Sequence, residues 1–269
     1  MKPDLPLGAG SLRFGAVTHV MGVINLSPES RNRPTVVHAP HEALEMAQRY
    51  REWGATLVDL GGQSSHFESP EVPLELELQR LIPVVELLAS EHFLVSVDTW
   101  KPAVAQAALA AGAVIINDTG GLQEPLMRKL AAKAKAAVVV VYVEAANPHQ
   151  VGSIDARPAK AARTAAWFRQ RLEMYRADGI EGLILDPGIA LNYRGDYETY
   201  TKLQIEVIRE SRELHALGYP VLIPIPRKRE DHRVMAYITL AVEYQADIIR
   251  VHDVREACDL VTLLGRAAR

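Results

Sequence analysis

Eight short apolar runs recur along the chain and constrain its fold more than any other feature. They lie at residues 18–25, 56–62, 93–99, 114–118, 137–143, 182–189, 220–225 and 247–253. Most are rich in valine and isoleucine and do not alternate with polar residues, which is typical of strands that are buried on both faces. Segments with helical spacing separate the runs. The strands are therefore expected to pair in parallel through right-handed crossovers.

This order of elements predicts an α/β fold, a (β/α)8 TIM barrel that forms a single domain over residues 1–269. An open, doubly wound sheet is the alternative, and it would normally carry a glycine-rich dinucleotide turn after its first strand. The first apolar run leads instead into Asn-Leu-Ser-Pro-Glu-Ser at residues 25–30, which lacks those glycines. We therefore expect the barrel.

Composition argues against several classes of function. The chain has 30 Lys and Arg residues against 33 Asp and Glu residues, so no basic excess points to nucleic acid. The longest apolar run, residues 136–143, is far shorter than the roughly 20 residues of a membrane-spanning helix. Residues 1–15 show no signal-peptide pattern, and one cysteine, Cys258, allows no intrachain disulfide. We expect a cytoplasmic protein with neither a membrane nor a nucleic-acid partner.

Polar side chains follow the predicted strands at their carboxyl ends, where a barrel of this kind builds its active site. In chain order they are Asn25, Asp98, Asn117, Asp186, Lys228, Arg250 and His252. Helix N-capping explains single aspartates and asparagines, but it does not require a lysine, an arginine and a histidine at the same rim. Carboxylates, amides and a lysine around one cavity suit a flat heterocycle, whereas Arg250 and His252 suit an anion such as phosphate.

Six segments resemble those of dihydropteroate synthase, the pterin-binding barrel of folate synthesis. In the order of that family they read MGVINLSPES, VDLGGQSS, VSVDTWKPAVAQAALAAGAVIINDTGG, LILDPGIA, PRK and IIRVHDV, and they cover about residues 21–254. The resemblance implies that the protein joins p-aminobenzoate to the methylene carbon of a dihydropterin pyrophosphate and releases pyrophosphate. The small-molecule partners implied are a pterin and p-aminobenzoate.

The resemblance also implies which residues hold the pterin. Asp98, Asn117 and Asp186 resemble the ligands of the pterin ring. Lys228 resembles the lysine that contacts the ring carbonyl, and Arg250 resembles the arginine that stacks on the ring. These five residues are expected to bind the substrate.

The remaining roles concern the pyrophosphate and the second substrate. His252 and Asn25 resemble ligands of pyrophosphate and Mg²⁺, with Asn25 as the metal ligand, and Arg229 lies near the expected carboxylate of p-aminobenzoate. We expect Mg²⁺ only together with the substrate, because one amide is a poor site for a cation on its own. The candidate catalytic residues are Lys228, Asp98 and Asn25. By analogy with the family, we also expect a homodimer.

Two loops depart from the pattern of the family. The first has Glu29 in place of an aspartate and Arg31 in place of a phenylalanine, and it lacks a Gly-Gly pair. The second reads Gln-Ser-Ser-His-Phe at residues 63–67 and lacks the pyrophosphate-binding arginine, for which His66 is a partial substitute. Three functions fit this pattern: a divergent dihydropteroate synthase, a pterin-binding relative without the condensation activity, or a corrinoid-linked methyltransferase that acts on a methylated tetrahydropterin.

Overall fold

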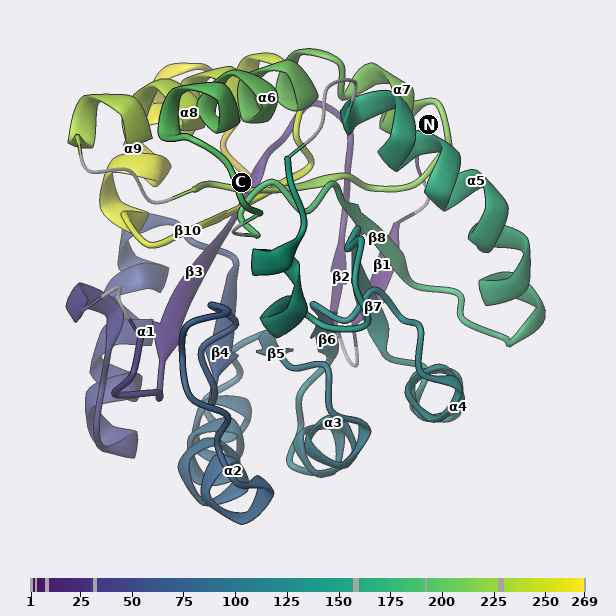
Figure 1. The fold of residues 1–269 in the computed structure, drawn as a ribbon. Helices are drawn as coiled ribbons and strands as arrows, with labels where there is room; N and C mark the ends of the chain where they lie inside the picture. The colour runs from purple at the N-terminus through teal and green to yellow at the C-terminus, as the bar shows by residue number, and fades with distance from the viewer. Residues whose placement is uncertain are drawn as a thin grey trace.

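Eight parallel strands form the central sheet of the computed structural model, which describes the chain except for residues 1, 3, 8–9, 31–32, 157–159, 192, 227–229 and 269. Neighbouring strands follow the order β8-β7-β6-β5-β4-β3-β10-β9. A bridge between Leu185 and Val221 joins β8 to the residue before β9, so the sheet curls into a nearly closed barrel. Helices surround the strands (Figure 1). The predicted (β/α)8 barrel is confirmed.

Each predicted apolar run contains one strand of the barrel. The strands are β3 (His19–Asn25), β4 (Leu57–Gly61), β5 (Val95–Asp98), β6 (Ile115–Asp118), β7 (Ala137–Val141), β8 (Leu183–Asp186), β9 (Leu222–Pro224) and β10 (Ile248–Val251). The helices are α1 (Pro40–Trp53), α2 (Leu74–Ser90), α3 (Pro102–Ala110), α4 (Pro125–Ala134), α5 (Lys160–Ala177), α6 (Tyr197–Arg209), α7 (Arg212–His215), α8 (Asp231–Glu243) and α9 (Val254–Leu263), with short 3-10 turns η1 (Arg33–Thr35) and η2 (Pro148–Ser153). In the part of the chain that the structure describes, no helix is both long and apolar enough to cross a bilayer.

A short antiparallel hairpin precedes the barrel and closes its amino end. It consists of β1 (Leu5–Leu7) and β2 (Gly10–Leu12). Leu5, Leu7 and Leu12 are buried in one cluster with Leu57 and Ile115, the first residues of β4 and β6. The sequence pattern does not predict this hairpin, because each of its strands is only three residues long.

The register of the parallel strands brings their polar ends to one level. Asn25 pairs with Gly61, Gly61 with Asp98, and Asp98 with Asn117. Four adjacent strands therefore end along one rim of the barrel, and the loops that follow them enclose the space above it.

Candidate active site

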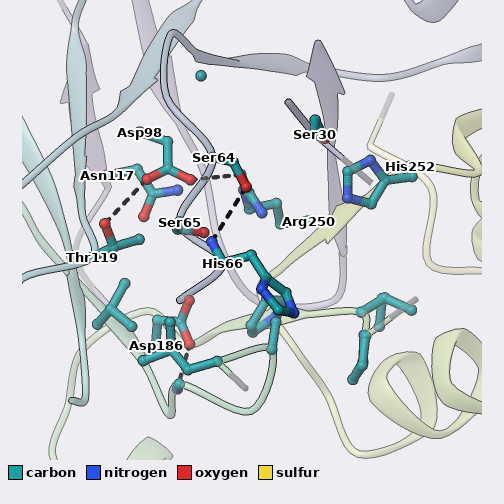
Figure 2. A pocket seen from close by; sticks show the side chains of 18 of the residues that line it. Ser30, Ser64, Ser65, His66, Asp98, Asn117, Thr119, Asp186, Arg250 and His252 are labelled. Carbon is teal, nitrogen blue, oxygen red and sulfur yellow. Dashed lines mark hydrogen bonds and ion pairs between the residues drawn. The ribbon is translucent and has the colours of Figure 1, made fainter. Parts of the chain in front are cut away.

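A cavity of about 550 Å³ opens at this rim. Six residues that the sequence singled out line it: Asn25, Asp98, Asn117, Asp186, Arg250 and His252. Figure 2 shows Asp98 beside Asn117, with Arg250, Asp186 and His252 around the same space. Arg31, Lys228 and Arg229 lie outside the described residues. The structure thus brings the six together, while their individual roles stay predictions.

A buried carboxylate that the sequence analysis missed, Asp59 on β4, organises the floor of the cavity. Asp59 is 0% exposed and accepts hydrogen bonds from Ser96 Oγ (2.6 Å), Asn117 Nδ2 (3.1 Å) and Arg250 Nε (2.6 Å). An aspartate in the middle of an apolar strand is costly unless it is paired, and this is the signal by which the sequence could have revealed it. Asp59 therefore fixes the positions of Asn117 and Arg250.

Arg250 lies between two carboxylates. Besides its bond to Asp59, it donates from Nη2 to Asp98 Oδ2 over 2.9 Å. Burial raises the pKa of Asp98 to about 7, although the positive charge of Arg250 opposes this rise. Since two acidic groups already face the guanidinium, the geometry argues against the interpretation of Arg250 as an anion ligand.

Asn117 presents an acceptor without a partner. Its Oδ1 atom is buried and makes no hydrogen bond to the described residues, whereas its amide nitrogen donates to Asp59. The side chain is fixed, because the residue is only 2% exposed. A buried acceptor left unsatisfied costs about 1–3 kcal/mol. A ligand N–H in the cavity would satisfy this atom.

A tight turn after β8 holds Asp186 at the edge of the cavity. Asp186 Oδ1 accepts a hydrogen bond from the backbone N–H of Gly188 over 2.6 Å. Gly188 has a φ of +67°, and a Cβ atom there would collide with the backbone carbonyl of Tyr142. Only glycine fits this turn, so the Asp-Pro-Gly sequence sets the direction of the carboxylate.

The first loop is anchored by a residue that departs from the family pattern. Glu29 receives a forked pair of hydrogen bonds from Arg80 of α2, with Nη1–Oε2 at 3.2 Å and Nη2–Oε1 at 3.1 Å. Burial opposes the ionisation of Glu29, but hydrogen bonds from Ser27 and Arg80 outweigh it and lower its pKa. Glu29 thus ties the loop to α2, while its neighbour Ser30 lines the cavity.

The second loop is held at its base by a partly buried lysine. Lys101 Nζ donates to Glu77 Oε2 (2.8 Å), Gln63 Oε1 (2.6 Å) and the carbonyl of Val72 (3.0 Å). Gln63 and Val72 are the two ends of the loop, so one ammonium group joins them. Between these ends, His66 lines the cavity, as its proposed part in pyrophosphate binding requires.

At the edge of the cavity near the first loop, three side chains form a chain of hydrogen bonds. Asn25 Nδ2 donates to Thr35 Oγ1 over 2.7 Å, and Thr35 Oγ1 lies 3.0 Å from His252 Nδ1. Among the residues that the structure describes, no three His, Cys, Asp or Glu side chains form a group that could hold a metal.

Comparison with known proteins places the chain in a family. The model of the family described as pterin binding enzyme matches residues 21–264. The chain belongs to the pterin binding enzyme family. The resemblance inferred from the six sequence segments is thereby confirmed.

Relatives of this pterin binding enzyme are dihydropteroate synthases. The one from Synechocystis sp. is 30% identical, and the alignment covers 98% of this chain and 96% of that protein. The structure of dihydropteroate synthase from Thermus thermophilus in complex with 4-aminobenzoate has a TM-score of 0.83 and 30% identity, covering 98% of this chain and 99% of its own. The Burkholderia cenocepacia enzyme complexed with 7,8-dihydropteroate has a TM-score of 0.82 and 28% identity, with coverages of 98% and 96%.

Proposed function

We propose that this chain is a dihydropteroate synthase of folate biosynthesis. The amine nitrogen of p-aminobenzoate forms a C–N bond to the methylene carbon of a dihydropterin pyrophosphate. The C–O bond to pyrophosphate breaks, its electron pair leaves with the pyrophosphate, and the amine gives up a proton. The observation that carries the proposal is the convergence of Asp98, Asn117 and Asp186 on one cavity, in a chain that matches dihydropteroate synthases over nearly its whole length.

The floor of the cavity suits the donors and acceptors of a pterin ring. Asp186 and the Oδ1 atom of Asn117 would accept hydrogen bonds from N–H groups of the ring, and a carboxylate does so with charge assistance. With a pKa of about 7, Asp98 is present both with and without its proton near neutral pH. It would therefore donate a hydrogen bond to the ring or accept one from it. We keep Arg250 as the residue that stacks on the ring and Lys228 as the group that contacts its carbonyl.

The edge formed by Asn25 and His252 suits the pyrophosphate. The amide nitrogen of Asn25 is bound to Thr35, so its carbonyl oxygen is the polar atom left for a ligand. One such oxygen fits Mg²⁺ that arrives with a diphosphate, because Mg²⁺ takes few protein ligands and prefers phosphate oxygens. When bound, Mg²⁺ would neutralise charge that develops on the departing pyrophosphate. Arg229 would pair with the carboxylate of p-aminobenzoate.

A turnover assay tests the proposed function. Purified protein is incubated with the dihydropterin pyrophosphate, p-aminobenzoate and Mg²⁺, and 7,8-dihydropteroate is detected by mass. We expect product with the parent chain and a strong loss of product with Asp98→Ala. Tight binding of the pterin without product would instead support a binding protein, and methyl transfer from a methylated tetrahydropterin to cobalamin would support a methyltransferase.

We further propose a single domain that forms a homodimer in the cytoplasm. Leu263 supports the dimer, because it lies on the last helix, α9, and is 76% exposed, which suits contact with a second copy. Cys258 supports a reducing compartment, because it is buried as a free thiol. Light scattering after size exclusion tests the dimer: Leu263→Glu should lower the measured mass to that of one chain. A parent chain that already elutes as a monomer would refute it.

A further inference from the structure

Thr35 is fixed at the edge of the cavity by the backbone around it. The first loop returns to the end of β3, where Val37 N donates to the carbonyl of Asn25 over 2.9 Å and Asn25 forms a bridge with Val36. The turn η1 ends at Thr35, whose side chain is buried between β3 and the end of β10. The position of the hydroxyl group is therefore set by the loop, independently of any ligand.

The hydroxyl of Thr35 determines which end of the Asn25 amide can meet a ligand. It accepts the hydrogen bond from Asn25 Nδ2, which keeps the amide nitrogen on the side of the loop. The two ends of an amide have nearly the same shape, so without this bond the group can turn over. A reversed Asn25 would present N–H groups where a cation needs an oxygen.

The same hydroxyl contacts the ring of His252. The 3.0 Å contact between Thr35 Oγ1 and Nδ1 restrains the orientation of the imidazole ring. His252 lines the cavity together with Asn25, and Figure 2 shows its ring near Ser30. One threonine thus orients both of the side chains that we assign to the pyrophosphate and its cation.

We propose that Thr35 is a positioning residue for the pyrophosphate and the Mg²⁺ that accompanies it. This inference rests on the proposed function, because it takes Asn25 and His252 as the side chains at the pyrophosphate. Residues that orient metal ligands typically contribute 10- to 100-fold in metal affinity or activity. Thr35 itself would touch neither substrate.

Calorimetry and kinetics on three variants test the inference. Thr35→Val keeps the shape of the side chain and removes the hydroxyl, Thr35→Ser keeps the hydroxyl, and Thr56→Val removes a hydroxyl far from the cavity that bonds to Val20. For Thr35→Val we expect about tenfold weaker binding of the dihydropterin pyrophosphate with Mg²⁺, and a matching rise in its KM. The KM for p-aminobenzoate and the affinity for the pterin without pyrophosphate should change less than about twofold.

The two other variants should bind the dihydropterin pyrophosphate like the parent chain. The inference is overturned if Thr35→Val binds it as tightly as the parent chain, or if this variant loses affinity equally for the pterin with and without pyrophosphate. The second outcome would mean a purely structural role. If the parent chain binds the pyrophosphate substrate but gives no product, the proposed function fails, and calorimetry still decides the part played by Thr35.

Discussion

Replacement of Asp59 by asparagine tests most directly whether this carboxylate organises the floor of the cavity. Asparagine keeps the size of the side chain and removes its charge. Its oxygen can accept from Arg250 and Asn117 if its NH₂ group faces Ser96, whose hydroxyl can accept. The network then keeps its connections. The bonds with Ser96 and Asn117 become neutral ones, and the ion pair with Arg250 becomes a hydrogen bond from a cation to a neutral oxygen.

The size of the effect follows from these three hydrogen bonds. A bond to a charged group contributes about 1.5–3 kcal/mol and a neutral bond about 0.5–1.5 kcal/mol, so each conversion costs about 1 kcal/mol. Arg250 keeps its bond to Asp98, so the full cost of an unpaired buried charge does not arise. We expect Asp59→Asn to lower the free energy of unfolding by about 3 kcal/mol. Pterin affinity should fall about tenfold, because Asn117 and Arg250 are held less firmly.

Urea denaturation measures the stability of this variant, and fluorescence titration measures its affinity for a pterin. Ser96→Ala is the matched control, because it removes one bond from the same carboxylate on the side away from Arg250. It should destabilise by about 1.5–3 kcal/mol and leave pterin affinity within about twofold. If Asp59→Asn is destabilised but binds the pterin like the parent chain, Asp59 does not organise the site and the reasoning is refuted.

Three further predictions concern ligand binding, pH and stability. Asp186→Asn should weaken pterin binding by about 1.5–3 kcal/mol, measured by calorimetry, because a hydrogen bond to a charged acceptor is lost. Burial raises the pKa of Asp118 to about 7, so the folded state holds a proton that the unfolded state releases near pH 4. Stability from this group is therefore lost as pH rises from about 4 to 7. When the free energy of unfolding is measured by urea denaturation across this range, the contribution of Asp118 should make it fall by up to about 1.4 kcal/mol per pH unit in the parent chain, and this contribution should be absent in Asp118→Asn. Lys101→Met should destabilise by about 3–5 kcal/mol in the same assay, because it leaves the buried carboxylate of Glu77 without its ammonium partner.

Each of these predictions has an outcome that contradicts it. Unchanged affinity of Asp186→Asn would remove Asp186 from the binding site. If the free energy of unfolding changes equally with pH in the parent chain and in Asp118→Asn, then Asp118 is not protonated in the folded state. A Lys101→Met variant as stable as the parent chain would show that the ion pair with Glu77 makes no net contribution to the free energy of unfolding.

The barrel was predictable because its strands are buried on both faces. That environment demands continuous apolar runs, and all eight were visible, from residues 18–25 to residues 247–253. The hairpin of β1 and β2 was not predictable in the same way. Its strands are too short to reveal an alternation of apolar and polar residues. Its leucines are buried only because the open end of the barrel lies beside them.

The site was predictable where its polar residues lie at the carboxyl end of a strand. Asn25, Asp98 and Asn117 could be grouped because parallel strands in register end at one level. Asp59 was missed because it lies inside a strand, where only the cost of burying its charge marks it. Thr35 was missed for a different reason: its place depends on how the first loop folds back onto β3, and no local pattern encodes that return.

A crystal structure of the protein soaked with a dihydropterin tests the central claim most directly. We predict one ring in the cavity, with N–H groups of its edge within hydrogen-bonding distance of Asp186 and of Asn117 Oδ1, and with Asp98 beside it. A ring bound elsewhere, or no ring at a concentration that saturates binding in solution, would contradict the account.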